Sequence, residues 1–142
     1  LTRSIKTLSV RMQKHNENGE RVASFLEAHP KIIKIHYPGI EQKYKSIASQ
    51  QMNGYGGMMS IVLDTNLEGA KKFLSNLKIF TLAESLGGVE SLIEHPAIMT
   101  HASIDKKIRE SLGISDSLLR LSVGIEDVED IIYDLEQALD NI

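Results

Sequence analysis

The segment that most constrains the fold lies near the C-terminal end of the chain, at residues 118–139. Its first half, "LLRLSVG", places Leu119, Leu121 and Val123 at alternate positions, which is the spacing of a half-buried strand. Its second half, "EDVEDIIYDLEQAL", is acidic at its start, where the positive end of a helix dipole favours negative charge. The apolar residues of this half fall on one helical face: Val128, Ile131, Ile132, Leu135 and Leu139. The segment predicts a strand followed by a one-sided helix.

The rest of the chain alternates in the same way between helical and strand-like patterns. Helices are predicted at 2–28, at 41–52 and after a cap at Thr65 or Asn66, and further strands at 31–37, 58–64 and 78–83. Within the first helix, Asn18-Gly19 is the expected weak point, and a long irregular segment is expected before residue 118. Four short strands alternating with helices predict a two-layer α+β fold, with the helices packed on one face of the sheet.

Length and composition favour one domain and exclude some partners. A chain of 142 residues with 42% hydrophobic and 25% charged residues is long enough for one core, so residues 1–142 are expected to form a single domain. The net charge of −3 argues against nucleic acid as a partner. The absence of cysteine and of a long apolar run predicts a cytoplasmic protein with no membrane contact. Because the first residue is Leu1, the chain is expected to be a piece of a longer protein.

Two features could carry chemistry. In "AESLGGVES", at residues 83–91, the pair Gly87-Gly88 would let backbone N–H groups approach an anion, but the same pair also suits a tight connection after a strand. Arg120 interrupts an apolar strand, where a guanidinium has to reach water or pair with a carboxylate or phosphate. A solvated strand arginine remains the alternative.

The histidines do not form a recognisable metal or catalytic pattern. His95 and His101 are six residues apart in "IEHPAIMTHAS", a spacing that matches no zinc signature, and no cysteine supports one. No metal is therefore expected.

Two long motifs resemble a known family. The stretches "LKIFTLAESLGGVESLIEHPAIMTHASI" and "LGISDSLLRLSVGIEDVEDIIYDLEQAL", with "LSVRMQKHNENG" and "YPGI" upstream, resemble the C-terminal domain of the pyridoxal-phosphate (PLP) enzymes of cysteine and methionine metabolism. The match is closest to cystathionine γ-lyase and γ-synthase and covers practically the whole chain. It implies the C-terminal domain of a fold-type-I PLP enzyme, with a small, mostly antiparallel sheet and helices on one face.

The resemblance also implies roles for particular residues. Arg120 matches the arginine that holds the substrate α-carboxylate, Ser85 lies near that carboxylate, Glu84 faces the distal end of the substrate, and Thr100 lies close to the substrate. PLP is implied as the cofactor, bound mainly by a preceding domain that also supplies the Schiff-base lysine.

No lysine of this chain has the sequence context of the cofactor-binding one. Lys6, Lys34 and Lys78 lack that context, and no catalytic role is assigned to them. The cofactor contacts of this chain remain unknown, and the chain alone is expected to be inactive.

The expected function is that of a trans-sulfuration enzyme. A γ-lyase, which converts cystathionine to cysteine, 2-oxobutyrate and ammonia, is favoured by "PAIMTHASI" and "LGISDSLLRLSVGIED". The alternatives are a γ-synthase, which joins an acyl-homoserine to cysteine, and a freestanding binding or assembly module without catalysis. The resemblance implies a homotetramer for the full-length enzyme, with an amino acid as its substrate.

Overall fold

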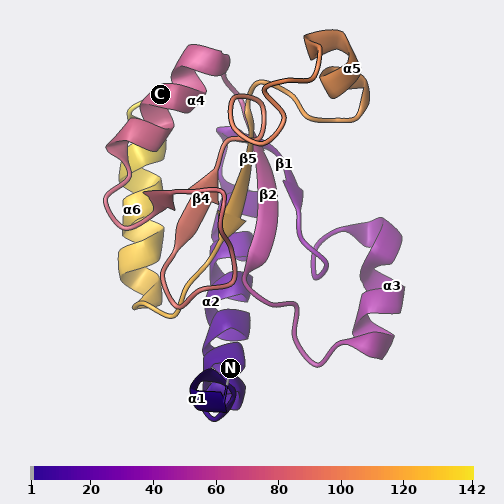
Figure 1. Ribbon diagram of the computed structural model, residues 1–142, viewed down its shortest axis with the longest axis vertical. Helices are drawn as coiled ribbons and strands as arrows, with labels where there is room; N and C mark the ends of the chain where they lie inside the picture. The colour runs from indigo at the N-terminus through magenta and orange to yellow at the C-terminus, as the bar shows by residue number, and fades with distance from the viewer. Residues whose placement is uncertain (1) are drawn as a thin grey trace.

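The structure is a computed structural model that describes residues 2–142, apart from the side chain of Gln42 (Figure 1). The helices are α1 (Thr2–Ile5), α2 (Leu8–Ala28), α3 (Gln42–Gln51), α4 (Leu67–Asn76), α5 (Lys106–Ser111) and α6 (Val128–Asp140). The strands are β1 (Ile32–His36), β2 (Met58–Leu63), β3 (Thr81–Leu82), β4 (Leu92–Glu94) and β5 (Leu118–Ser122).

The strands form one sheet of five strands in the order β1-β2-β5-β4-β3. All neighbouring strands are antiparallel except β3 and β4, which are parallel. The prediction of an α+β fold with a small, mostly antiparallel sheet is therefore confirmed.

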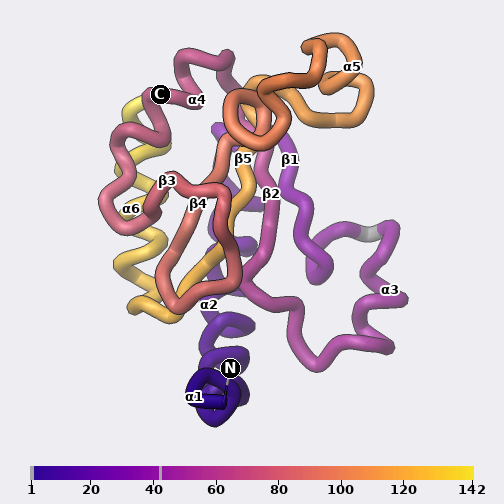
Figure 2. Tube along the Cα trace, in the orientation of Figure 1, coloured from indigo at the N-terminus to yellow at the C-terminus, as the bar shows by residue number. Residues whose placement is uncertain are grey.

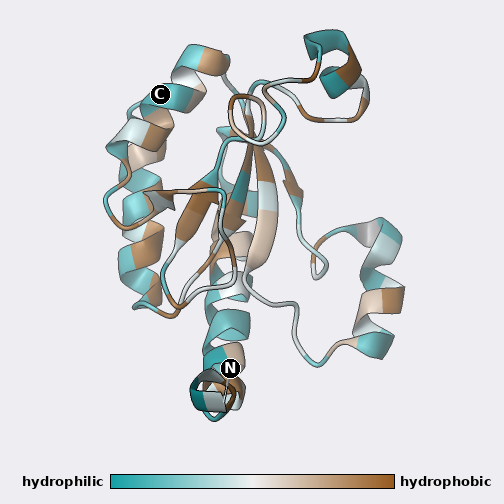
Figure 3. Cartoon of the chain, in the orientation of Figure 1, coloured by the Kyte–Doolittle hydropathy of each residue, from teal (hydrophilic) through white to brown (hydrophobic). Residues whose placement is uncertain are grey.

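Helices cover one face of the sheet. Met59, Ile61 and Leu63 of β2 and Leu119 and Leu121 of β5 are buried in the same core as residues of α2, α4 and α6. α2 packs beside α6, and α6 beside α4, while α3 and α5 project away from this layer (Figure 1). In Figure 3 the apolar colouring is strong on the central strands, whereas α2 and α6 also carry hydrophilic stretches. Because strand side chains alternate between faces, Arg120 and Ser60 point away from the helices.

The prediction of a weak point at Asn18-Gly19 was wrong. The long helix is interrupted near Thr7 and then runs unbroken through Gly19 to Ala28. Gly19 is needed for packing, because a Cβ there would lie 2.1 Å from the carbonyl oxygen of Gly56. The Asn18 amide donates to the carbonyls of Gly124 and Glu126, at 3.0 and 2.9 Å, so its polar group holds the helix against the loop before α6.

Other boundaries also differ from the sequence expectation. The expected strand at 78–83 shrinks to Thr81–Leu82, because the N–H groups of residues 78–80 donate to the Asp134 carboxylate on α6. The segment expected to be irregular contains β4 and α5, which raises the number of strands from four to five. Of the two candidate caps of α4, Asn66 is the one used, since its side chain accepts from the Gly69 N–H at 3.0 Å.

Candidate functional site

A row of polar residues crosses the sheet on the face away from the helices. Glu94 on β4 lies directly opposite Arg120 on β5, Arg120 lies opposite Ser60 on β2, and Ser60 lies opposite His36 on β1. Directly opposed residues share one face of a sheet, so four strands contribute to one polar row. Such a row is where a polar ligand could bind.

Arg120 is held by three acceptors within this row and the neighbouring loop. Its Nη1 lies 2.6 Å from Oε2 of Glu94. Its Nη2 donates to the carbonyl oxygen of Glu84 at 2.8 Å and approaches that of Ser85 at 3.4 Å. The Arg120 side chain is 25% exposed, so the guanidinium is fixed yet remains in reach of solvent.

Glu94 is the most buried member of the row. Its side chain is 1% exposed, and its second oxygen, Oε1, accepts a short hydrogen bond from the Thr100 hydroxyl. The Thr100 oxygen is also 2.8 Å from Nδ1 of His101. Both carboxylate oxygens of Glu94 therefore have a partner, as a buried charge requires.

The loop at residues 83–91, between β3 and β4, is fastened to the end of β5 and to the segment after it. Its course is traced in Figure 2. The Gly87 N–H donates to Oγ of Ser122 at 2.8 Å, and the Ser91 hydroxyl donates to Glu126 at 2.9 Å. Gly87 has φ +74°, a conformation that glycine adopts without strain. The Gly-Gly pair thus serves a tight, anchored connection, and it brings the backbone of Glu84 and Ser85 to Arg120.

The structure brings only some of the predicted substrate-binding residues close to Arg120. The backbone carbonyls of Glu84 and Ser85 contact Arg120, while the side chains of both residues are on the exposed surface. Thr100 reaches Arg120 indirectly, through Glu94. Sequence reasoning missed Glu94, although an acidic residue inside the apolar run "LIEHP" would have been a signal had β4 been recognised.

A buried histidine follows Glu94. His95 is fully buried, and its Nε2 donates to the carbonyl of Asp116 at 2.8 Å. Burial, the largest influence, lowers the pKa of His95, although the hydrogen bond to the Asp116 carbonyl opposes that shift. Its Nδ1 has no hydrogen-bond partner among residues 2–142. His95 and His101 thus have separate partners, and no group of three possible metal ligands occurs within the described part of the chain.

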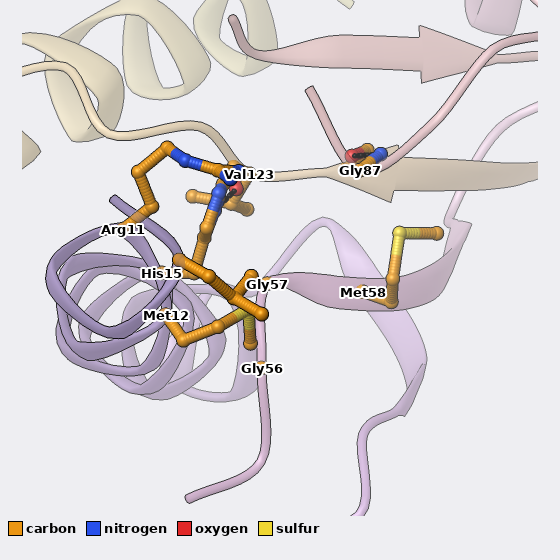
Figure 4. A pocket seen from close by; sticks show the side chains of 10 residues that line it. Arg11, Met12, His15, Gly56, Gly57, Met58, Gly87 and Val123 are labelled. Atoms are coloured by element: carbon orange, nitrogen blue, oxygen red, sulfur yellow. Dashed lines mark hydrogen bonds between the residues drawn. The ribbon is translucent and has the colours of Figure 1, made fainter. Parts of the chain in front are cut away.

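A separate cavity lies beside the loop, between the first turns of α2 and the ends of β2 and β5 (Figure 4). It has a volume of about 190 Å³, and Met12, Met58 and Gly87 are among the residues that line it. His15 crosses it from α2 and binds the Val123 carbonyl at 2.8 Å. The cavity is mostly apolar and contains none of the four predicted substrate contacts, so the polar row remains the candidate site.

A helix-covered sheet that presents a paired arginine on its other face defines the class of this molecule as an α+β domain with a polar site on the sheet. The family model "Cys/Met metabolism PLP-dependent enzyme" matches residues 1–140, and the chain belongs to that family. The resemblance seen in the sequence is thereby confirmed.

Individual relatives carry two different names. The chain is 56% identical to a cystathionine γ-lyase of Bos taurus over 96% of its own length and 34% of the relative's. It is 54% identical to a cystathionine β-lyase of Coxiella burnetii, over 96% of the chain and 36% of the relative. The crystal structure of a cystathionine γ-lyase from Lactobacillus plantarum complexed with L-serine matches with a TM-score of 0.89 and 47% identity, over 99% of this chain and 37% of that one. The chain thus spans about a third of the length of these relatives.

The three lysines considered in the sequence analysis lie on the surface. Lys6, Lys34 and Lys78 are all exposed, so none of these three sits in an enclosed site with other polar groups. Within residues 2–142, no helix is both long and apolar enough to cross a bilayer.

Proposed function

We propose that residues 1–142 are the substrate-side C-terminal domain of a PLP-dependent carbon–sulfur lyase that acts on cystathionine. The observation that carries this proposal is Arg120, a guanidinium fixed on the sheet by Glu94 and by the 83–91 loop and still 25% exposed. Arginine suits a planar carboxylate because its N–H groups form a rigid fork. The family and its relatives supply the reaction class.

The residues of this chain would bind and orient the substrate. Arg120 would hold the α-carboxylate, with Ser85 beside it, Glu84 toward the distal end of the substrate and Thr100 near the same site. When PLP is bound by the rest of the enzyme, it supplies the electron sink for breaking a bond at the α-carbon of the amino acid. Holding the carboxylate fixes which bond of the substrate faces the cofactor, and such positioning can account for much of a rate enhancement.

Of the possible reactions, we propose γ-elimination, in which cystathionine and water give cysteine, 2-oxobutyrate and ammonia. The competing reaction is β-elimination, which gives homocysteine, pyruvate and ammonia, and it is favoured by the name of the relative from Coxiella burnetii. Incubating the full-length enzyme with cystathionine and identifying the keto acid separates the two. Formation of 2-oxobutyrate would support the γ-lyase. Formation of pyruvate would contradict it and show a β-lyase.

Two further experiments test the γ-synthase and the freestanding module. Turnover of an acyl-homoserine with cysteine by the full-length enzyme, at a rate comparable to that of cystathionine, would favour the γ-synthase. Calorimetry on the isolated chain tests the freestanding module, since amino-acid binding that is lost in Arg120→Ala would support it. We expect neither result, because a site shared with a second domain is incomplete in this chain.

The isolated chain should also fail to bind PLP at one position. Purified chain is mixed with PLP and reduced with borohydride, and its peptides are mapped by mass. We expect no stoichiometric adduct, because the resemblance places the Schiff-base lysine in a domain that precedes residues 1–142. A stoichiometric adduct on one lysine would mean that the cofactor site lies in this chain. A tetrameric, cytoplasmic full-length enzyme remains our expectation, which sizing and cell fractionation can check.

A further inference from the structure

We propose that the buried Glu94 and the exposed Thr100 form a positioning pair that sets the direction of the Arg120 guanidinium for the α-carboxylate of the substrate. This inference rests on the proposed function, because it assumes that Arg120 binds that carboxylate. The Glu94 carboxylate orients the arginine, and the Thr100 hydroxyl orients the Glu94 carboxylate. Thr100 would then act through Glu94 in addition to lying near the substrate.

The contacts run as a chain from Thr100 to Glu94 to Arg120. The backbone pairing of β4 with β5 places Glu94 directly opposite Arg120, where side chains are close enough to interact. One carboxylate oxygen, Oε2, lies 2.6 Å from Nη1 of Arg120, and the other accepts a hydrogen bond from the Thr100 hydroxyl. With both oxygens used, the carboxylate has little freedom to rotate, and its direction is passed on to the guanidinium.

The loop fixes the guanidinium from the other side. Nη2 of Arg120 donates to the Glu84 carbonyl at 2.8 Å, so the two terminal nitrogens are held by different elements of the fold. A guanidinium carries five N–H donors, so donors remain for a ligand beyond those that contact Glu94, Glu84 and Ser85. An arginine held in this way loses little side-chain freedom when a carboxylate binds, and pre-organisation of this kind favours affinity.

Electrostatics supports a positioning role for Glu94. A carboxylate with 1% exposure is costly without a partner, and Arg120 supplies that partner. The negative charge of Glu94 also partly neutralises Arg120, and this neutralisation alone would weaken the attraction between Arg120 and a substrate carboxylate. Glu94 would therefore favour binding by orienting the guanidinium, and a neutral hydrogen-bond acceptor at residue 94 should preserve most of that orientation.

The test uses the full-length enzyme and two ligands that differ only in the carboxylate, L-serine and ethanolamine. The variants are Thr100→Val, Thr100→Ser, Glu94→Gln and Glu94→Ala, and inhibition constants for both ligands are measured alongside KM and kcat for cystathionine. We expect Thr100→Val to raise the L-serine inhibition constant and KM roughly 3–10-fold, and Glu94→Ala to raise them more, with ethanolamine changed less than about twofold. Thr100→Ser, which keeps the hydroxyl, and Glu94→Gln, which keeps an acceptor, should stay closer to the wild type.

Controls separate this inference from the proposed function. Thr81→Val, at an exposed threonine of β3, should change neither ligand's binding. Arg120→Lys should weaken L-serine but not ethanolamine, and an unchanged L-serine constant in that variant would overturn the proposed function itself. If Arg120→Lys behaves as expected while Thr100→Val and Glu94→Ala leave L-serine unchanged, or weaken both ligands alike, the positioning pair is wrong. Thr100 lies on the exposed surface, so Thr100→Val remains informative even if Glu94→Ala fails to fold.

Discussion

Glu126 accepts two hydrogen bonds from Ser91, one from its backbone N–H at 2.7 Å and one from its hydroxyl at 2.9 Å. The same hydroxyl accepts from the Gly124 N–H at 2.9 Å. Glu126 comes just before α6, and Ser91 ends the loop at 83–91. The loop at 83–91 contains Glu84 and Ser85. This contact therefore attaches that loop to the segment that follows β5, the strand of Arg120.

Glu126→Ala should loosen that loop. Removing the carboxylate leaves the Ser91 N–H and hydroxyl without their acceptor, at a cost of about 1–3 kcal/mol in the free energy of unfolding. Hydrogen exchange of the amides at 83–91 should rise, and chemical denaturation should show the loss in stability. Glu129→Ala is the matched control, since the Glu129 side chain is 68% exposed and, among the described residues, forms its salt bridge with the exposed Arg21. Equal effects of the two substitutions would contradict the role given to Glu126.

Gly19→Ala should destabilise the protein even though alanine is the better helix former. The substitution gains about 1 kcal/mol in helix propensity. It also places a Cβ 2.1 Å from the Gly56 carbonyl oxygen, which belongs to the backbone and cannot rotate away. We expect a net loss of roughly 1–3 kcal/mol, as in other overpacked cores. Thermal unfolding measures it, with Ser24→Ala at an exposed position of α2 as the control. A stabilised Gly19→Ala protein would disprove the close approach of α2 to residue 56.

The regular elements were predictable from the sequence, but the boundaries set by tertiary contacts were not. Periodicity identified α2, α6 and β5 because one face of each packs into the core. β4 was missed because it is buried on both faces and has only three residues, so no alternation could be seen. β3 is short because Asp134, distant in sequence, takes the backbone N–H groups before it. Gly19 looked weak for the same reason, since its partner is far along the chain.

The candidate site divides in a similar way. Arg120 could be singled out locally, as a charge inside an apolar strand. The roles of Ser85, Glu84 and Thr100 came from resemblance and stay predictions. Glu94 needed the pairing of β4 with β5, which short strands do not announce in sequence. Glu94, the residue opposite Arg120 on the next strand, is thus the part of this site that could be found only from the fold.

Asp116→Asn should cost more stability than removing its exposed partner. Hydrogen bonds from Lys106, and then from Arg109, hold the pKa of Asp116 below its ordinary value. Nη2 of Arg109 lies 2.7 Å from Oδ1, and the Arg109 side chain is 7% exposed, so losing the carboxylate charge leaves a buried guanidinium poorly compensated. We expect a loss of about 1.5–3 kcal/mol by urea denaturation, since hydrogen bonds to charged groups contribute about that much. Lys106→Met, at a side chain 61% exposed, should cost less. The reverse order would show that Lys106, and not Arg109, is the important partner.

His95 should make the protein less stable in mild acid. Burial lowers the pKa of His95 in the folded state, while the unfolded chain titrates near the ordinary value of about 6.5. Below that pH the unfolded state binds a proton that the folded state resists, so stability falls as the pH drops from about 6.5 through the lower folded pKa. The main cause is burial, which disfavours the charged ring, and Nδ1 in addition has no hydrogen-bond partner among the described residues. The charged groups that influence it are Asp116, which favours the proton, and Arg109 and Lys71, which oppose it.

The measurement is the free energy of unfolding at several pH values, for the wild type and for His95→Gln. The glutamine amide can still donate to the Asp116 carbonyl but takes up no proton. Its stability should therefore fall less steeply between about pH 6.5 and 5, while the two curves run parallel above pH 7, where the histidine is neutral in both states. The loss due to Asp116 has the same sign but a separate window, because it starts near the ordinary carboxyl pKa of the unfolded chain, about 4, and continues down through the lower folded pKa. Parallel curves over the whole range would mean that His95 takes up its proton in the fold as readily as in the unfolded chain.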